Sequence, residues 1–159
     1  MIRANKSPEM SVTPSDNDSF SLGLDVGATK THGVILDAND HILAEHVEPT
    51  RKGEEGIGTT ILDVSTRLAR QLGVSVSAFT SVGIGIPGIV RYPTGMVENA
   101  VNLGIGRMNL IDLVAASFAA PVRVENDVKA SAWVLDPLPA CRTKTTATSI
   151  SARAWRRQR

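Results

Sequence analysis

The stretch FSLGLDVGATKTHGVILD, residues 20–37, decides the fold of this 159-residue chain. From Phe20 to Val26, apolar residues alternate with small or polar ones, which is the period of a strand with one buried face. The short turn ATKT follows, and the apolar run in HGVILD predicts a second strand. After a turn at Asn39-Asp40, the segment HILAEHVE, residues 41–48, predicts a third strand. Strands joined by turns this short can pair only as an antiparallel meander.

Helices and strands alternate beyond the meander. Apolar residues at helical spacing from Ile57 to Leu72, with Gly73 as a stop, indicate the first helix. The expected elements are a helix over 53–73, a strand over 79–88, a hairpin over 89–99 that turns at residues 93–95, a helix over 108–120 that begins near residue 109, a strand over 121–127 and a helix over 127–136. This order indicates an α/β fold in which parallel strands join the meander in one mixed sheet, with helices on its faces.

Length and composition narrow the class of protein. With 42% hydrophobic residues, the chain suffices for one domain, or one domain with tails, whose core needs neither a disulfide nor a metal. No apolar run approaches the ~18–20 residues that cross a bilayer, and residues 1–20 lack a hydrophobic signal segment. The single cysteine, Cys141, excludes an internal disulfide. We therefore expect a soluble, cytoplasmic protein without a membrane partner.

The net charge of +1 conceals a split along the chain. Residues 1–136 contain 11 Lys and Arg against 16 Asp and Glu, whereas residues 137–159 contain 6 Lys and Arg and no acidic residue. A basic tail of this kind can bind nucleic acid or another acidic surface. Residues 1–19 are rich in Ser, Asp, Asn and Pro without an apolar period, so we expect a disordered lead-in.

The first candidate site is the turn Asp25-Val26-Gly27-Ala28-Thr29-Lys30 between the first two strands. Its backbone N–H groups can point into one small concavity, and Gly27 would let a phosphate approach closely. Thr29 offers a hydroxyl, Lys30 a positive charge, and Asp25 at the strand end could hold a hydrated Mg²⁺. The same residues also fit an ordinary hairpin turn with a solvated lysine.

The second candidate site is Val124-Glu125-Asn126-Asp127, where a predicted strand ends and a helix begins. Ligands bind at strand ends in open α/β sheets. There, Asp127 could take a proton from a substrate hydroxyl and Asn126 could hydrogen-bond a neighbouring one. Helix capping is the alternative, because Asn and Asp are preferred N-cap residues.

The third candidate site is GIGIPG, residues 83–88, with Thr94-Gly95, Glu98-Asn99 and Asn102-Leu103. Turns rich in Gly and Asn can offer backbone and amide groups to a polyol, although a structural loop explains them equally well. These glycines lie within and just after a strand, so they are not a dinucleotide-binding fingerprint. Metal-ligand spacing is absent from the three histidines, and no metal site is predicted from His32, His41 and His46.

Taken in this order, the three segments resemble the ROK family of bacterial sugar kinases and regulators over about residues 20–136. LGLDVGATKTHGVILD resembles the family's first phosphate loop, VGIGIPGIVRYPTGMVENAVNLG its sugar-side segment, and VRVENDVKASAW its catalytic strand and helix. The resemblance implies the actin-like, ribonuclease-H-like N-terminal half of a two-domain, ATP-dependent hexose kinase that is similar to glucokinases. It also implies Mg²⁺ beside the ATP, and full-length relatives are often homo-oligomers.

The resemblance implies roles for individual residues as well. Asp127 would be the base that deprotonates the sugar hydroxyl for attack on the γ-phosphate of ATP. The residues implied at the sugar are Gly95, Glu98, Asn102 and Asn126, and those implied at the phosphates and Mg²⁺ are Asp25, Gly27, Thr29 and Lys30. Ala28 stands where many relatives have a second glycine, which is a small departure.

Larger departures begin after Asp136. The family continues with a second domain that holds a Gly-Thr-Gly phosphate loop, a Glu/His sugar-contact segment and often a His/Cys zinc site, and residues 137–159 match none of these. We expect this truncated N-terminal portion to have little or no kinase activity alone. The alternatives are a sugar-responsive regulator of the same family and a non-catalytic sugar-binding remnant. The regulator is less favoured, because about 19 residues before the first strand are few for a winged helix-turn-helix.

The basic tail, residues 137–159, has no apolar period, and we hypothesise that it is a frameshifted translation. If the third base of each codon is read with the first two of the next, the codons from Lys144 to Arg157 permit Asp-Asp-Gly-Tyr-Leu-Asn-Leu-Gly-Thr-Gly-Leu-Ala. That product resembles the family's missing phosphate loop. A tail that binds nucleic acid is less favoured, because Trp155 is its only aromatic residue and no helical or strand pattern organises its charges.

Overall fold

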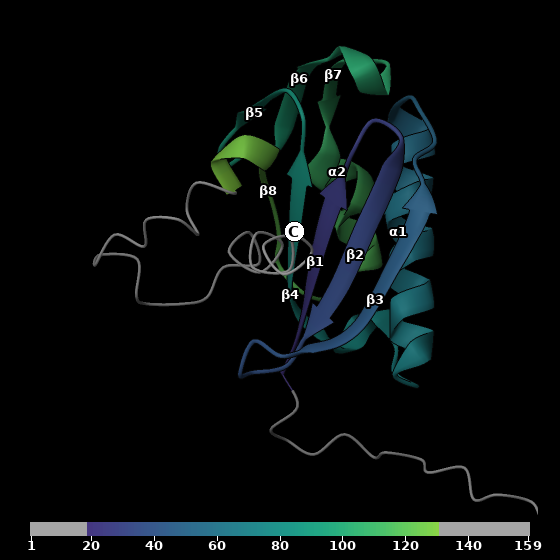
Figure 1. Cartoon of the computed structure of the whole chain (residues 1–159). Helices are drawn as coiled ribbons and strands as arrows, with labels where there is room; N and C mark the ends of the chain where they lie inside the picture. The colour runs from purple at the N-terminus through teal and green to yellow at the C-terminus, as the bar shows by residue number, and fades with distance from the viewer. Residues whose placement is uncertain (1–18, 131–159) are drawn as a thin grey trace, which may run out of the picture.

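A five-stranded sheet forms the centre of the fold in the computed structural model, which describes residues 19–130. The strands, in spatial order, are β3 (Ile42–Pro49), β2 (Lys30–Leu36), β1 (Phe20–Val26), β4 (Phe79–Ile86) and β8 (Val122–Asn126). The β3–β2 and β2–β1 pairs are antiparallel, whereas β4 lies parallel between β1 and β8. The predicted meander and mixed sheet are therefore confirmed (Figure 1). Residues 1–18 of the predicted lead-in over 1–19, residues 131–136 of the helix predicted over 127–136, and the basic tail over 137–159 lie outside the described residues.

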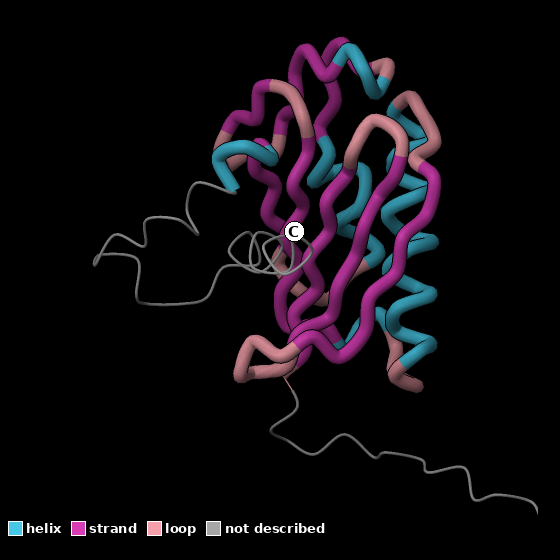
Figure 2. Tube along the Cα trace, in the orientation of Figure 1, coloured by secondary structure: helices cyan, strands magenta, loops and turns pink. Residues whose placement is uncertain are grey.

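Helix α1 (Glu54–Gln71) covers one face of this sheet and agrees with the helix predicted over 53–73. Leu22 and Leu24 of β1 are fully buried in one hydrophobic cluster with Ile61 and Leu68 of α1. Burial of a side chain of this size stabilises the fold by roughly 1.5–3 kcal/mol. Figures 1 and 2 show α1 and the short helix α2 (Leu110–Val114) behind the sheet. Within residues 19–130, no helix has the length and apolar character needed to span a membrane.

Strand β2 lies so close to α1 that Gly33 has no room for a side chain. A Cβ at Gly33 would lie 2.5 Å from Cγ1 of Val64 and 2.8 Å from Cδ1 of Leu68. Gly33 therefore faces α1. Because successive residues of a strand point to opposite faces, the neighbouring side chain of His32 faces away from the helix.

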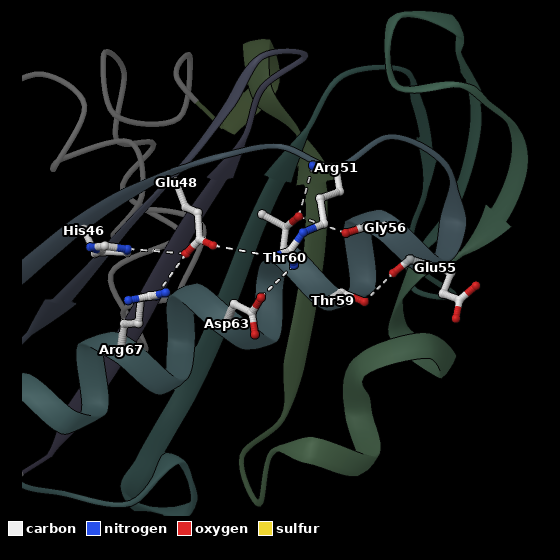
Figure 3. A network of polar contacts seen from close by, with 9 residues as sticks. All are labelled: His46, Glu48, Arg51, Glu55, Gly56, Thr59, Thr60, Asp63 and Arg67. Atoms are coloured by element: carbon white, nitrogen blue, oxygen red, sulfur yellow. Dashed lines mark hydrogen bonds and ion pairs between the residues drawn. The ribbon is translucent and has the colours of Figure 1, made fainter.

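A polar network joins α1 to the edge strand β3 (Figure 3). The carboxylate of Glu48 lies 3.2 Å from Nε of Arg67 and 3.7 Å from Nη2 of Arg51, and Arg51 donates a hydrogen bond of 2.6 Å to Oδ2 of Asp63. Nε2 of His46 lies 3.4 Å from Oε2 of Glu48. Both of these atoms are buried without a hydrogen bond of suitable geometry. Glu48 is thus held chiefly by attraction to the two arginines.

A second sheet of three strands follows β4. It consists of β5 (Ile89–Arg91), β6 (Met96–Ala100) and β7 (Ile105–Asn109), which pair antiparallel in that order. The hairpin predicted over 89–99 is confirmed, but β7 is an additional strand that the sequence pattern did not indicate. Its two apolar residues, Ile105 and Met108, are buried because β6 pairs beside them.

The helix predicted over 108–120 is shorter than expected. Its predicted start is confirmed, because Asn109 is the N-cap of α2 and its Oδ1 accepts a hydrogen bond from the backbone N of Asp112. A single 3₁₀ turn (Ala115–Ser117) follows α2, and Phe118 is extended and buried in the core. The predicted end is wrong, since burial of Phe118 overrides the helix propensity of the alanine-rich run.

Candidate active site

Two acidic residues flank one glycine at the carboxyl edge of the parallel strands. In the register of the sheet, Asp25 of β1 is opposite Gly85 of β4, and Gly85 is opposite Glu125 of β8. Asp127 follows directly after β8. A Cβ placed on Gly85 would lie 4.0 Å from Oδ1 of Asp25 and 3.8 Å from Cα of Asp127. The fold thus brings together two residues that the sequence analysis assigned to separate motifs, at the edge where α/β sheets bind ligands.

The electrostatic setting of Asp25 is unusual for an acidic residue. Burial raises the pKa of Asp25, and the negative charge of Asp127 raises it further. His32 and Lys30 act in the opposite direction. A carboxylate in this setting favours a nearby cation, and perturbed carboxyl groups of this kind are common at functional sites.

The predicted phosphate loop is a tight hairpin turn between β1 and β2. The backbone N of Gly27 donates a hydrogen bond of 2.9 Å to the carbonyl of Lys30, and the carbonyl of Thr29 accepts one of 3.0 Å from the N of Thr50. A Cβ at Gly27 would lie 2.9 Å from the Lys30 carbonyl oxygen, so the turn itself requires this glycine. Thr29 and Lys30 are exposed. The turn geometry therefore explains why residue 27 is a glycine. The side chains of Thr29 and Lys30, which the sequence predicts to contact phosphates, are exposed on this turn.

Asn126 holds the start of the last described helix, whose residues 127–130 are helical. Its Oδ1 accepts hydrogen bonds of 3.1 Å from the backbone N atoms of Val128 and Lys129, which is N-cap geometry. Its Nδ2 donates a hydrogen bond of 2.8 Å to the carbonyl of Gly88. Asn126 therefore caps the helix in this structure, which is the alternative role that the sequence offers for it. The amide nitrogen carries one further hydrogen, which is the donor that Asn126 could offer to a ligand.

Gly95 has a structural role in the second sheet. Its φ is +70°, and a side chain there would collide with Ile111 of α2. Its N donates to the carbonyl of Arg91, and its own carbonyl accepts from the N of Leu110. Asn102 is exposed in the 3₁₀ turn (Val101–Leu103) that connects β6 to β7.

Glu98, predicted near the sugar, is paired with two arginines. Nε and Nη2 of Arg91 donate hydrogen bonds of 3.0 and 2.8 Å to Oε2 of Glu98, and Nε of Arg107 lies 3.7 Å from Oε1. The Arg91 guanidinium holds the pKa of Glu98 below its usual range. The carbonyl oxygen of Glu98 would lie 2.8 Å from a Cβ placed on Gly88, so its backbone adjoins the glycine that Asn126 binds.

A hollow of about 490 Å³ lies elsewhere, at the start of α1. Its lining residues are Lys52, Gly53, Glu54, Glu55, Gly56 and Thr59, and none of them is a predicted site residue. Two carboxylates there make it a poor site for a phosphate. Over residues 19–130, no group of three or more His, Cys, Asp and Glu side chains is arranged to hold a metal ion.

Solved structures of similar fold define the class of this protein. The ROK family glucokinase of Streptomyces griseus, in complex with glucose and AMPPNP, matches with a TM-score of 0.64 and 30% identity over 72% of this chain and 35% of that one. The described sheet and helices therefore form an α/β domain of the actin-like ATPase fold, as predicted.

The family follows from the sequence comparison. The model of the ROK family matches residues 21–149, and the chain belongs to this family. The glucokinase of Streptomyces coelicolor is 34% identical over 114 residues, which is 72% of this chain and 34% of the relative. The xylose repressor of Caldicellulosiruptor bescii is 25% identical over 113 residues, 70% of this chain and 28% of the relative. The chain spans about a third of the length of the curated glucokinases that it matches.

Sequence reasoning missed two features of the site. Gly85 lay within a glycine-rich stretch that was assigned as a whole to the sugar side, and only the strand order shows it between Asp25 and Asp127. The link from Asn126 to Gly88 joins residues 38 positions apart, and no local pattern indicates it. Both features depend on β4 and β8 being neighbours in the sheet.

Proposed function

We propose that this chain is the N-terminal portion of a sugar kinase that transfers the γ-phosphate of ATP to a hydroxyl group of a hexose. The proposal rests on the pair Asp25 and Asp127, which flank Gly85 at the carboxyl edge of the sheet in a member of the ROK family. The glucose and AMPPNP bound by the Streptomyces griseus enzyme support a hexose and ATP as ligands. A kinase of this kind would work in the cytoplasm, where ATP is available.

In this proposal Asp127 is the general base. It would accept the proton of the sugar hydroxyl as the hydroxyl oxygen attacks the γ-phosphorus and the bond to the leaving ADP breaks. The base must be held in one place, because positioning and electrostatics supply most of the catalysis in phosphoryl transfer. The N-cap hydrogen bonds of Asn126 support this role, since they fix the backbone where Asp127 begins the helix.

Asp25 would lie on the phosphate side of the site. Mg²⁺ prefers oxygen ligands and is usually bound by one or two carboxylates together with phosphate oxygens and water. Asp25 fits such an ion, because burial and the charge of Asp127 raise its pKa, and a bound cation would offset both effects. When bound, Mg²⁺ would neutralise charge on the phosphate oxygens. The exposed side chains of Thr29 and Lys30 would contact the phosphates, with Gly27 shaping the turn that carries them.

The sugar side would be formed by Gly95, Glu98, Asn102 and Asn126. Asn126 has the strongest support, because it adjoins Asp127 in the chain and its amide keeps one hydrogen for a sugar oxygen. Gly95 would contribute by shaping the turn, since its backbone N and carbonyl already bond to Arg91 and Leu110. Glu98 would have to exchange its contacts with Arg91 for contacts with sugar hydroxyls.

A sugar-responsive regulator is the second candidate function, and the match to a xylose repressor favours it. Such a protein needs to bind a sugar but needs neither ATP nor a base. The two functions therefore differ in whether Mg²⁺ and nucleotide affect sugar binding.

Calorimetric titration of the chain with glucose, with and without Mg²⁺ and AMPPNP, tests the proposal. We expect the chain to bind glucose, and to bind it more tightly when Mg²⁺ and AMPPNP are present. The variant Asp127→Asn should bind glucose less tightly than the control variant Asp63→Asn, whose substitution lies on α1. Sugar binding that is indifferent to Mg²⁺ and nucleotide would favour the regulator, and absence of glucose binding would contradict the hexose assignment. In a coupled ADP-release assay the chain alone should remain at background, and normal turnover would refute our expectation that it is inactive alone.

A further inference from the structure

Three side chains from neighbouring strands lie in a row on the face of the sheet opposite α1. His32 of β2 is directly opposite Asp25 of β1 in the antiparallel register, and directly opposite Val47 of β3. Glu45 is two residues from Val47 along β3, so it lies on the same face. Cross-strand partners have Cβ atoms about 4.5–5.5 Å apart, which places the imidazole of His32 within reach of the Asp25 carboxylate.

A second carboxylate, that of Glu45, lies near the imidazole of His32. Nε2 of His32 lies 3.7 Å from Oε2 of Glu45, and the side chain of His32 is only 11% exposed, against 60% for Glu45. The two nitrogens of an imidazole ring point in different directions, so Nδ1 does not face Glu45 when Nε2 does. The nearest element on that other side of β2 is β1, which carries Asp25.

We propose that His32 is a positioning residue for Asp25: its imidazole, held by Glu45, donates a hydrogen bond to the Asp25 carboxylate and fixes it toward Gly85 and Asp127. This inference rests on the proposed function, in which Asp25 binds Mg²⁺. Carboxylates that bind metal ions are commonly oriented by a second hydrogen-bonding partner, and loss of that partner typically costs 10–100-fold in metal affinity.

The charged groups around Asp25 support this arrangement. Asp127 lies on the β8 side, and Lys30 and His32 come from β2. Burial and the charge of Asp127 raise the pKa of Asp25, and attraction to His32 and Lys30 offsets part of this rise. Lys30 is exposed on a long side chain, whereas His32 is nearly buried, so His32 is the group able to fix one orientation of Asp25.

The contact itself can be tested on the chain without ligand, from the ring ¹⁵N signals of its histidines at a fixed pH. Asp25→Asn should shift the ring signals of His32 and leave those of His41 unchanged. The matched control is Asp37→Asn, since Oδ2 of Asp37 lies 3.0 Å from Nδ1 of His41. That substitution should shift His41 and leave His32 unchanged. If Asp25→Asn leaves the His32 ring unaffected, the contact does not exist and the inference fails.

The role is tested by the affinity of the chain for Mg²⁺ with AMPPNP. His32→Ala should weaken this binding by about tenfold, and His32→Asn, which keeps an N–H donor, should restore part of the loss. His41→Ala is the control and should bind as the wild type does. Wild-type affinity in His32→Ala would overturn the inference while leaving the proposed function intact. If the wild-type chain binds no Mg²⁺ with AMPPNP, the proposed function fails, and the role of His32 fails with it whatever the ring signals show.

Discussion

Asn126→Ala should lower the free energy of unfolding by about 2 kcal/mol, because the Asn126 side chain makes three hydrogen bonds at the junction of β8 and the last described helix. Two of them cap the helix from Oδ1, and loss of an N-cap of this type costs about 1 kcal/mol. The third joins Nδ2 to the carbonyl of Gly88, and a hydrogen bond of this kind contributes about 1 kcal/mol.

Two further variants separate the contributions of the cap and of the bond to Gly88. Asn126→Ser keeps an oxygen that can cap the helix but loses the donor to Gly88, so it should be destabilised by about 1 kcal/mol. Asn126→Asp also keeps the cap and loses the donor, but it adds a negative charge beside Asp127 and should be less stable than the serine variant.

Urea unfolding followed by circular dichroism measures the free energy of unfolding of all three variants, provided that the slope of this free energy against urea concentration is unchanged. A stability of Asn126→Ala within 0.5 kcal/mol of the wild type would refute the role of Asn126 at this junction. A serine variant as unstable as the alanine variant would refute the division between the cap and the bond to Gly88.

Four other predictions concern the fold, the site and the tail. Glu48→Gln should destabilise the chain by about 1 kcal/mol in urea unfolding, because Glu48 is 15% exposed between two arginines. Asp63→Asn, at a 43% exposed side chain, should have a much smaller effect, and equal effects would contradict the importance of burial in this network. Gly33→Ala should cost about 1–3 kcal/mol because its Cβ would lie 2.5 Å from a side chain of α1, and an unchanged melting temperature would show that the helix packs less closely. Asp25→Asn should be more stable than the wild type at pH 7. The raised pKa means that the folded state holds the Asp25 proton more tightly than the unfolded state, so wild-type stability falls as the pH rises above about 4. Urea unfolding at pH 7 and at pH 4 should show that the difference in unfolding free energy between wild type and Asp25→Asn is smaller at pH 4. An Asp25→Asn variant that is less stable than the wild type at pH 7 would contradict this prediction. Sequencing the DNA that encodes residues 137–159 should reveal a continuous family-like domain in another reading frame, and its absence would end the frameshift hypothesis.

The sequence predicted the strands of the central sheet well, because alternating or continuous apolar runs mark them and the turns of the meander are short. It did not predict β7, whose apolar residues are buried only because β6 pairs beside them. It also predicted too long a helix after Asn109, because the burial of Phe118 depends on the folded core and not on local propensity.

The candidate site was predicted in pieces. Asp25 and Asp127 were each identified at the end of a predicted strand, and strand ends are chemically informative positions. Their position on either side of Gly85 depends on the order β1-β4-β8, which no local pattern encodes. The pairing of Glu98 with Arg91 likewise arises from the register of β5 and β6, in which residue 91 is opposite residue 96.

The most direct test of the central claim is to map ligand binding on the amide resonances of the isotope-labelled chain. If Asp25 and Asp127 belong to one phosphoryl-transfer site, glucose with Mg²⁺ and AMPPNP should shift the amide signals of residues 25–30, 85–88 and 126–128 together. These segments meet at the carboxyl edge of β1, β4 and β8. Shifts confined to residues 52–59, around the hollow at the start of α1, or the absence of shifts at all three segments, would contradict the claim.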